Sequence, residues 1–105
     1  MTALDPPVVI ERMARRLRAG GTAHPVAAAV SVAARGHARL SLHEFADAVE
    51  VPTEIVRSAE LGSIAFGELP AAIGAQVGET GADLLALADL ESEWRDEPPA
   101  SAAGP

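Results

Sequence analysis

Short segments in which apolar residues recur every three or four positions, each ended by glycine or proline, occupy most of this chain. Residues three or four apart lie on one face of an α-helix, and glycine and proline interrupt helices. One such segment contains Leu42, Phe45, Ala46 and Val49 and is followed by Pro52. No stretch shows the alternation of apolar and polar residues that is typical of a half-buried strand. The sequence therefore predicts an all-α protein, a compact bundle of five or six short helices.

The predicted helices extend from near the N-terminus to the region of Trp94. They span about residues 7–19, 25–35, 41–49, 53–61, 67–77 and 82–95. The second helix is apolar along its length, so we expect it to be buried on most sides. Apolar residues make up 49% of the 105 residues but aromatic residues only 3%, so the core must consist of small and aliphatic side chains. Such a core suits closely packed short helices.

Residues suited to helix ends mark several of these boundaries. Ser41 followed by Glu44 has the spacing of a capping box at a helix start. Gly36 is expected to end the second helix, and Gly62 is expected to end the helix that follows Pro52 in a left-handed conformation.

The net charge of −7 is unevenly distributed along the chain. Residues 1–39 contain six arginines and two acids, which gives +4, whereas residues 40–105 contain two arginines and thirteen acids, which gives −11. This asymmetry fits an anion-binding face, but it fits equally well two halves that attract each other within a chain or across a dimer. It also fits solvated helix faces with internal pairing.

Several classes of function lack support in the sequence. Without cysteine there is no disulfide or thiolate site, and the spacings of His24, His37 and His43 match no metal-ligand pair. No catalytic motif is present, and periodicity places two pairs of carboxylates, Glu44 with Asp47 and Glu91 with Glu93, on exposed faces. We therefore expect no enzyme activity, no cofactor and no metal. No apolar run approaches the roughly 18 residues of a membrane span, and the N-terminus does not resemble a signal peptide, so a cytoplasmic protein is expected.

Residues 40–62 have the spacing of a helix-turn-helix. The matching positions are Leu40, Ser41, Phe45, Ala46, Val49, Val51, Val56, Glu60 and Gly62. This stretch resembles the Cro/phage-repressor-type (XRE-like) helix-turn-helix family, and the resemblance covers about residues 25–78. It divides the chain into an Arg-rich helix and linker (1–24), a helix-turn-helix domain (25–78) with its motif at about 42–61, a C-terminal helix (79–95) and a flexible tail (96–105).

The resemblance implies a small transcriptional regulator that binds double-stranded DNA, most often as a homodimer. The helix at about 53–61 would enter the major groove, with Arg57 as the best base contact. The other candidate contacts at this helix are Thr53, Glu54 and Ser58. Phosphate contacts would come from the basic residues Arg12, Arg15, Arg16, Arg35 and Arg39.

The departures from the family pattern lie where DNA would be met. Leu42 replaces a polar residue that opens the first motif helix, Glu50 replaces the turn glycine and has to accept a positive φ, and Glu54 would repel phosphates. They favour an alternative, a helix-turn-helix-derived protein-interaction module such as an adaptor, an antitoxin-like factor or an assembly factor.

Two further pairs of alternatives concern the ends of the chain. The N-terminal arginines either contact the DNA backbone or form ion pairs with acids of the last helix, namely Asp83, Asp89, Glu91 and Glu93. The last helix carries Leu84, Leu87, Leu90 and Trp94 at helical spacing. These residues either pack against the first helix or form a seam with a partner or a second copy.

Overall fold

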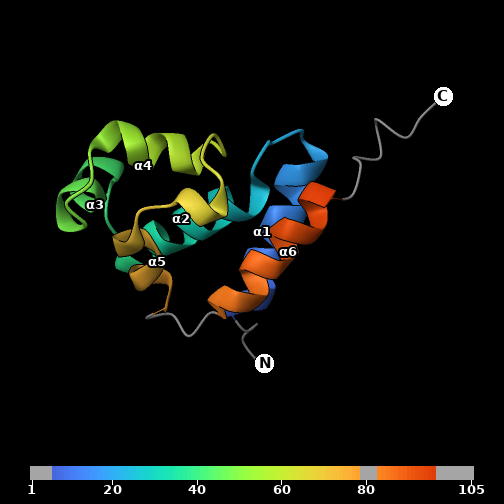
Figure 1. Ribbon diagram of the computed structural model, residues 1–105. Coiled ribbons are helices and arrows are strands. Elements are labelled where there is room, and N and C mark those ends of the chain that lie inside the picture. Colours follow the sequence, from blue (N-terminus) through green and yellow to red (C-terminus); the bar gives the residue numbers. More distant parts are fainter. Residues whose placement is uncertain (1–5, 79–82, 97–105) are drawn as a thin grey trace.

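The computed structural model describes residues 6–78 and 83–96, and all regular structure in these two ranges is helical (Figure 1). The elements are α1 (Pro6–Ala19), α2 (Pro25–Ala38), α3 (Leu42–Ala48), α4 (Thr53–Glu60), the 3-10 turn η1 (Phe66–Glu68), α5 (Ala71–Gly78) and α6 (Leu84–Asp96). The predicted all-α bundle is thereby confirmed. The predicted tail lies, apart from Asp96, outside the described residues. No described helix is long and apolar enough to cross a bilayer.

Helix α2 is the element around which the others pack. It contacts α1, α3, α4, α5 and α6, with α1 and α6 towards one end of it and α3 at the other (Figure 1). Every residue from Pro25 to Ser31 is buried, as the sequence predicted for this helix. The buried Ser31 hydroxyl donates to the Ala27 carbonyl at 2.8 Å, so its polar group is satisfied within the helix.

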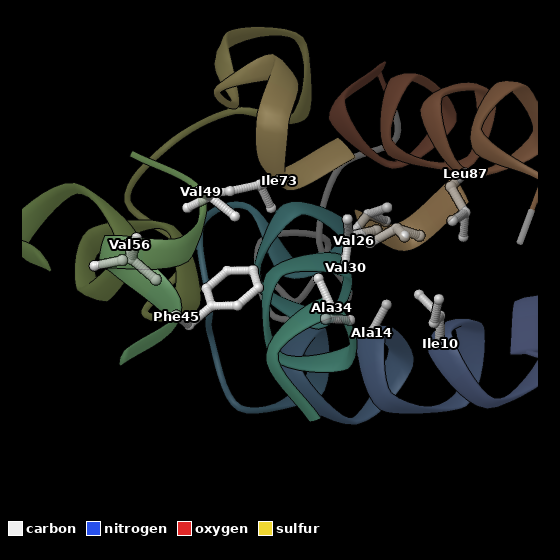
Figure 2. Packing of buried hydrophobic residues seen from close by; sticks show 13 residues of the cluster. Ile10, Ala14, Val26, Val30, Ala34, Phe45, Val49, Val56, Ile73 and Leu87 are labelled. Atoms are coloured by element: carbon white, nitrogen blue, oxygen red, sulfur yellow. The ribbon is translucent and has the colours of Figure 1, made fainter. Parts of the chain in front are cut away.

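The core contains one fully buried aromatic ring, that of Phe45, among aliphatic side chains (Figure 2). Ile10 and Ala14 reach this cluster from α1, and Leu87 reaches it from α6. The alanines keep the helices close, because a small side chain lets two backbones approach. The core is therefore continuous from the N-terminal helix to the last one.

Helix α2 does not end at Gly36, as the sequence predicted, but runs on to Ala38. The left-handed residue that ends it is Arg39, with φ 57°. The Arg39 N–H donates to the Gly36 carbonyl at 3.2 Å, and the Leu40 N–H donates to the Arg35 carbonyl at 3.5 Å. This is the bond pattern of a Schellman end, which glycine usually occupies. Nothing in the sequence alone distinguishes Gly36 as a helical residue from Gly36 as a stop.

The predicted helix at 67–77 also begins later than expected. Residues Phe66–Glu68 form η1, and α5 starts only at Ala71. Leu69 precedes a proline and is extended, with φ −63° and ψ 140°, because the Pro70 ring disfavours the helical conformation of the residue before it. The Pro70 carbonyl then accepts the Ile73 N–H at 3.0 Å and starts α5.

Helix α6 packs its apolar side inward. Leu87 is buried, and Leu84, Leu90 and Trp94 pack against the core, whereas Leu85 is exposed. The Asp83 carboxylate accepts the N–H groups of Leu85 and Ala86 and caps the start of the helix. The arrangement is the internal-packing alternative for this helix, so the predicted seam residues are already in use within the chain.

Gly62 joins the end of α4 to the connection between α1 and α2. Its φ is 79°, and its carbonyl accepts the His24 N–H at 3.1 Å. A Cβ at this position would overlap the Thr22 Cγ2 methyl group. The predicted left-handed conformation of Gly62 is therefore confirmed. Close packing against Thr22 is a second reason why glycine is needed at this position.

We predict that Gly62→Ala lowers the free energy of unfolding by about 2–4 kcal/mol, because it adds left-handed strain and a steric overlap. Gly36→Ala is the matched control: Gly36 is helical and an added Cβ meets nothing within 4 Å. This control should raise stability by about 0.5–1 kcal/mol. Urea unfolding followed by circular dichroism measures both, and equal effects of the two changes would contradict the assignment.

Candidate functional site

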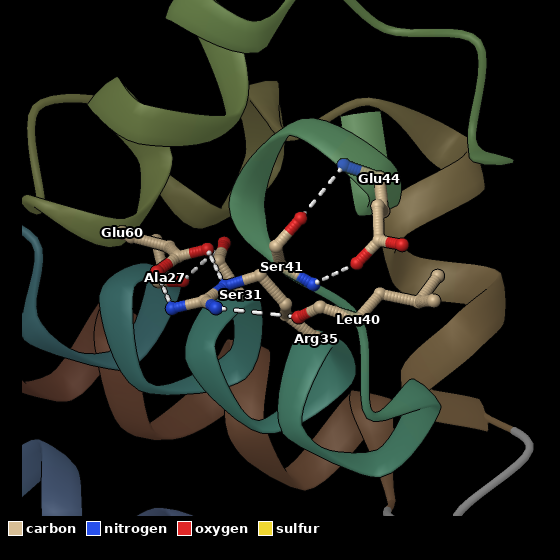
Figure 3. A network of polar contacts seen from close by, with 7 residues as sticks. All are labelled: Ala27, Ser31, Arg35, Leu40, Ser41, Glu44 and Glu60. Carbon is tan, nitrogen blue, oxygen red and sulfur yellow. Dashed lines mark hydrogen bonds and ion pairs between the residues drawn. The ribbon is translucent and has the colours of Figure 1, made fainter. Parts of the chain in front are cut away.

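The helix-turn-helix begins with a capping box at the start of α3 (Figure 3). The Glu44 N–H donates to Ser41 Oγ at 3.2 Å, and the Ser41 N–H donates to Glu44 Oε1 at 3.0 Å. The predicted cap is thereby confirmed. Hydrogen bonds from the Ser41 backbone and from its hydroxyl lower the pKa of Glu44. The carboxylate is therefore charged, and the box closed, at neutral pH; it opens only as the pH falls through this lowered pKa.

Glu50 forms the turn between α3 and α4 with φ 56°. The sequence predicted this conformation, because glycine is the residue expected at the turn. The following Val51 N–H donates to the Ala46 carbonyl at 3.0 Å, and Val49 beside it is buried. The residue before Glu50 is thus anchored by burial and the residue after it by a hydrogen bond, while the Glu50 carboxylate stays exposed.

Arg35 links three parts of the motif through its guanidinium (Figure 3). Its Nε and Nη2 donate to the two carboxylate oxygens of Glu60 at 2.8 and 3.0 Å, and its Nη1 donates to the Leu40 carbonyl at 3.3 Å. The hydrogen bond to Glu60 raises the pKa of Arg35, and partial burial opposes this shift. The candidate phosphate contact Arg35 is therefore occupied inside the protein, and sequence reasoning missed its partner because 25 residues separate the two.

Helix α4 turns Val56 and Ala59 into the core and leaves its other side in solvent. Glu54 and Arg57 are exposed, Thr53 and Ser58 are half-buried, and two apolar residues, Ile55 and Leu61, are 39% and 68% exposed. Thr53 Oγ1 lies 3.2 Å from His43 Nδ1, which joins the start of α4 to the first turn of α3. The four candidate residues of this helix thus lie together on or near its outer side.

The exposed side chains of α3, the turn and α4 form a surface that we call the α3–α4 face. It consists of His43, Asp47, Glu50, Glu54, Ile55 and Arg57. His43 and Asp47 are one helical turn apart, and the contact of His43 with Thr53 brings that row next to α4. This face therefore carries three carboxylates and a single arginine.

The N-terminal arginines lie on α1, towards the opposite end of α2 from α3 (Figure 1). Arg15 pairs with Glu11 of its own helix at 2.7 Å, and the Arg15 and Arg18 guanidinium groups lie 5.5 and 4.8 Å from the centre of the Trp94 ring. These are cation–π contacts across α1 and α6. Within the described part of the chain, Arg12 and Arg16 are exposed and have no hydrogen bond or ion pair.

The predicted acidic partners of these arginines include Glu91, which bonds elsewhere. Its Oε2 accepts the Phe66 N–H at 2.6 Å, and the residue is 8% exposed. The expectation that Glu91 is an exposed-face carboxylate is wrong, because α6 turns Leu84, Leu87 and Trp94 inward and position 91 lies on the same side. Arg39, another candidate phosphate contact, is exposed between α2 and α3.

In comparisons with known proteins, no family model, no curated protein and no solved structure matches this chain. The resemblance to the Cro/phage-repressor type therefore stays a prediction that rests on the spacing of residues 40–62. No group of three or more metal-ligating side chains occurs among the described residues.

We predict that the Arg35–Glu60 pair is worth far more than a surface pair. In a double-mutant cycle of Arg35→Met and Glu60→Gln, the coupling should be about 1–2 kcal/mol, since the pair is bidentate and partly buried. The same cycle on the exposed pair, Arg15→Met with Glu11→Gln, should give about 0.5 kcal/mol or less. Chemical unfolding measures both couplings, and similar values for the two pairs would refute the special role of Arg35.

We also predict that Glu50→Gly raises the free energy of unfolding by about 0.5–1 kcal/mol, because glycine adopts the left-handed turn without strain. Glu50→Gln is the control, since it removes the charge and keeps the strained conformation. Thermal unfolding of both variants separates the two effects: if Gln stabilises as much as Gly, charge repulsion and not backbone strain is the cause.

Proposed function

We propose that this chain is a helix-turn-helix-type interaction module whose α3–α4 face binds a protein partner with positive charges. The observation that carries this proposal is the excess of exposed carboxylates on the α3–α4 face, where Asp47, Glu50 and Glu54 accompany one arginine, Arg57. A DNA reader would place this same side against phosphates.

The charge of the face opposes an approach to DNA. Contacts to phosphates supply most of the non-specific affinity of DNA-binding proteins, and each carboxylate near a phosphate repels it. Arg35, which lies on α2 beside the motif, is bound to Glu60. The remaining arginines of α1 lie near the other end of α2 and do not surround Arg57. Little positive charge is left to hold a duplex on α4.

The apolar residues of α4 favour a protein partner. Ile55 and Leu61 keep 39% and 68% of their surface exposed, in a segment that also carries Glu54 and Arg57. Protein interfaces combine an apolar centre with a polar rim. A partner helix with a few apolar residues flanked by Arg or Lys would match both features of the α3–α4 face.

DNA binding by a transcriptional regulator is the second candidate, and Arg57 favours it. Its guanidinium is exposed on α4, one turn after Thr53, where a recognition helix carries a base-reading arginine. Glu54 is able to accept a hydrogen bond from a cytosine amino group, and Arg39 is exposed close to the start of α3. In this case phosphate contacts would be few, and binding would be weak at moderate salt.

A nuclear magnetic resonance titration distinguishes the two candidates. Labelled protein is mixed with an amphipathic peptide of about 15 residues with Arg on one face and Leu on the other, or with a short mixed-sequence DNA duplex. We expect the peptide to shift the amide signals of residues 43–58, and Glu54→Lys to weaken binding at least about tenfold. The duplex should leave these signals unchanged even at about 50 mM salt.

Glu93→Lys is the matched control, because it reverses an exposed carboxylate on α6, outside the α3–α4 face. It should bind the peptide like the unchanged chain. If instead the duplex shifts the α4 signals, if its affinity falls steeply between about 50 and 200 mM salt, and if Arg57→Ala abolishes the effect, the chain binds DNA and the protein-partner proposal fails.

A further inference from the structure

The described part of the chain has a second face of unpaired charge, and its sign is opposite to that of the α3–α4 face. We call it the α1 face; its exposed residues are Val8, Val9, Arg12, Arg16 and Ala19. They recur at helical spacing on the side of α1 that points away from Ile10 and Ala14. Val8 and Val9 are about as exposed as Ile55 on α4. Each face therefore pairs exposed aliphatic groups with charges of one predominant sign.

Within residues 6–78 and 83–96, the arginines of the α1 face form no ion pair. Arg15 and Arg18 stack on Trp94, but Arg12 and Arg16 project from the helix and form no ion pair within the described residues. The carboxylates Asp47, Glu50 and Glu54 are likewise exposed. Because α1 and α3 lie towards opposite ends of α2, the two faces cannot reach each other inside one molecule (Figure 1).

We propose that the cationic partner of the α3–α4 face is the α1 face of a second copy of this chain; this inference rests on the function proposed above. Arg12 and Arg16 of one copy would lie against Asp47, Glu50 and Glu54 of the next. Val8 and Val9 would meet Ile55, so that apolar groups lie among the charge pairs. The contact joins two helices along exposed faces that the fold leaves uncovered.

The charge pattern selects this orientation over others. With a net charge of −7, two copies repel each other on average, and contacts between two α3–α4 faces are the least favourable. Bringing the α1 face to the α3–α4 face replaces this repulsion with attraction over the few ångströms within which charges act strongly in salt. The faces that meet are different, so the contact is heterologous, and copies add head to tail unless a ring closes.

Charge reversal tests the proposal. One variant carries Arg12→Glu and Arg16→Glu, and a second carries Asp47→Lys and Glu54→Lys. Both faces of the first variant are then negative, and both faces of the second are predominantly positive. Sedimentation equilibrium at about 50 and 500 mM salt measures the association of each, and circular dichroism verifies that each is folded.

For the unchanged chain, the average mass should rise with concentration at low salt and return to that of a monomer at high salt. Each reversed variant alone should associate at least about tenfold more weakly. An equimolar mixture of the two should associate again, because opposite faces are then restored between unlike chains. A monomer at every concentration, or association that persists unchanged in either variant, would overturn the inference.

Peptide binding tests the function proposed for the α3–α4 face independently of self-association. The variant with Arg12→Glu and Arg16→Glu keeps that face intact, so it should still bind the Arg/Leu peptide. Peptide binding without self-association leaves the interaction module standing and rejects the second copy as its partner. Should a reversed variant fail to fold, Arg12→Gln with Arg16→Gln and Glu54→Gln replace the reversals, and each should weaken self-association of the folded chain.

Discussion

The bidentate pair between Arg35 and Glu60 fixes the relative positions of the helices that form the motif. Arg35 lies near the end of α2 and Glu60 is the last residue of α4, and the same guanidinium holds the Leu40 carbonyl at the entrance to α3. One planar side chain thus orients both helices of the helix-turn-helix against the buried helix α2. Arginine suits this task because its donors form a rigid fork, whereas lysine has a single point of charge. The same pair removes from the surface a positive charge that a DNA-binding protein would need there.

The turn between α3 and α4 places a carboxylate where the backbone conformation favours glycine. Glycine would occupy the left-handed position at Glu50 without strain, and among the described residues the exposed Glu50 carboxylate has no hydrogen bond or ion pair that would compensate for it. A carboxylate at a left-handed position, in the same segment as Asp47 and Glu54, is consistent with the interaction proposed for this face. Exposed Ile55 on the adjacent helix would add an apolar group to that interaction.

Local signals in the sequence were sufficient for much of the fold but not for its long-range contacts. The Ser41–Glu44 cap, the left-handed Glu50 and Gly62, and the inward side of α6 follow from spacing, since each depends on residues a few positions apart. The end of α2 was predicted wrongly because Arg39 and not Gly36 adopts the left-handed conformation, and a non-glycine residue in that conformation has no clear signal in the sequence. Likewise Glu91 is buried because the Phe66 N–H needs an acceptor, and the pairing of Arg35 with Glu60 depends on the packing of α2 against α4. The outer residues of α4 were predictable; their electrostatic surroundings were not.

The net charges of the two halves of the sequence do not show which surfaces of the folded protein carry exposed, unpaired charge. The N-terminal half has a charge of +4, yet Arg35 is bound to Glu60, and Arg15 and Arg18 lie against Trp94. On α1, the row formed by Arg12 and Arg16 stays exposed and has no ion pair with any described residue. At physiological ionic strength a charge acts over about 8 Å, so in the proposed interaction a partner would sense this row or the carboxylates of the α3–α4 face, and not the total of −7. Which arginines are available for that interaction depends on the contacts they make within the chain, and the stack on Trp94 is as important here as the pair with Glu60.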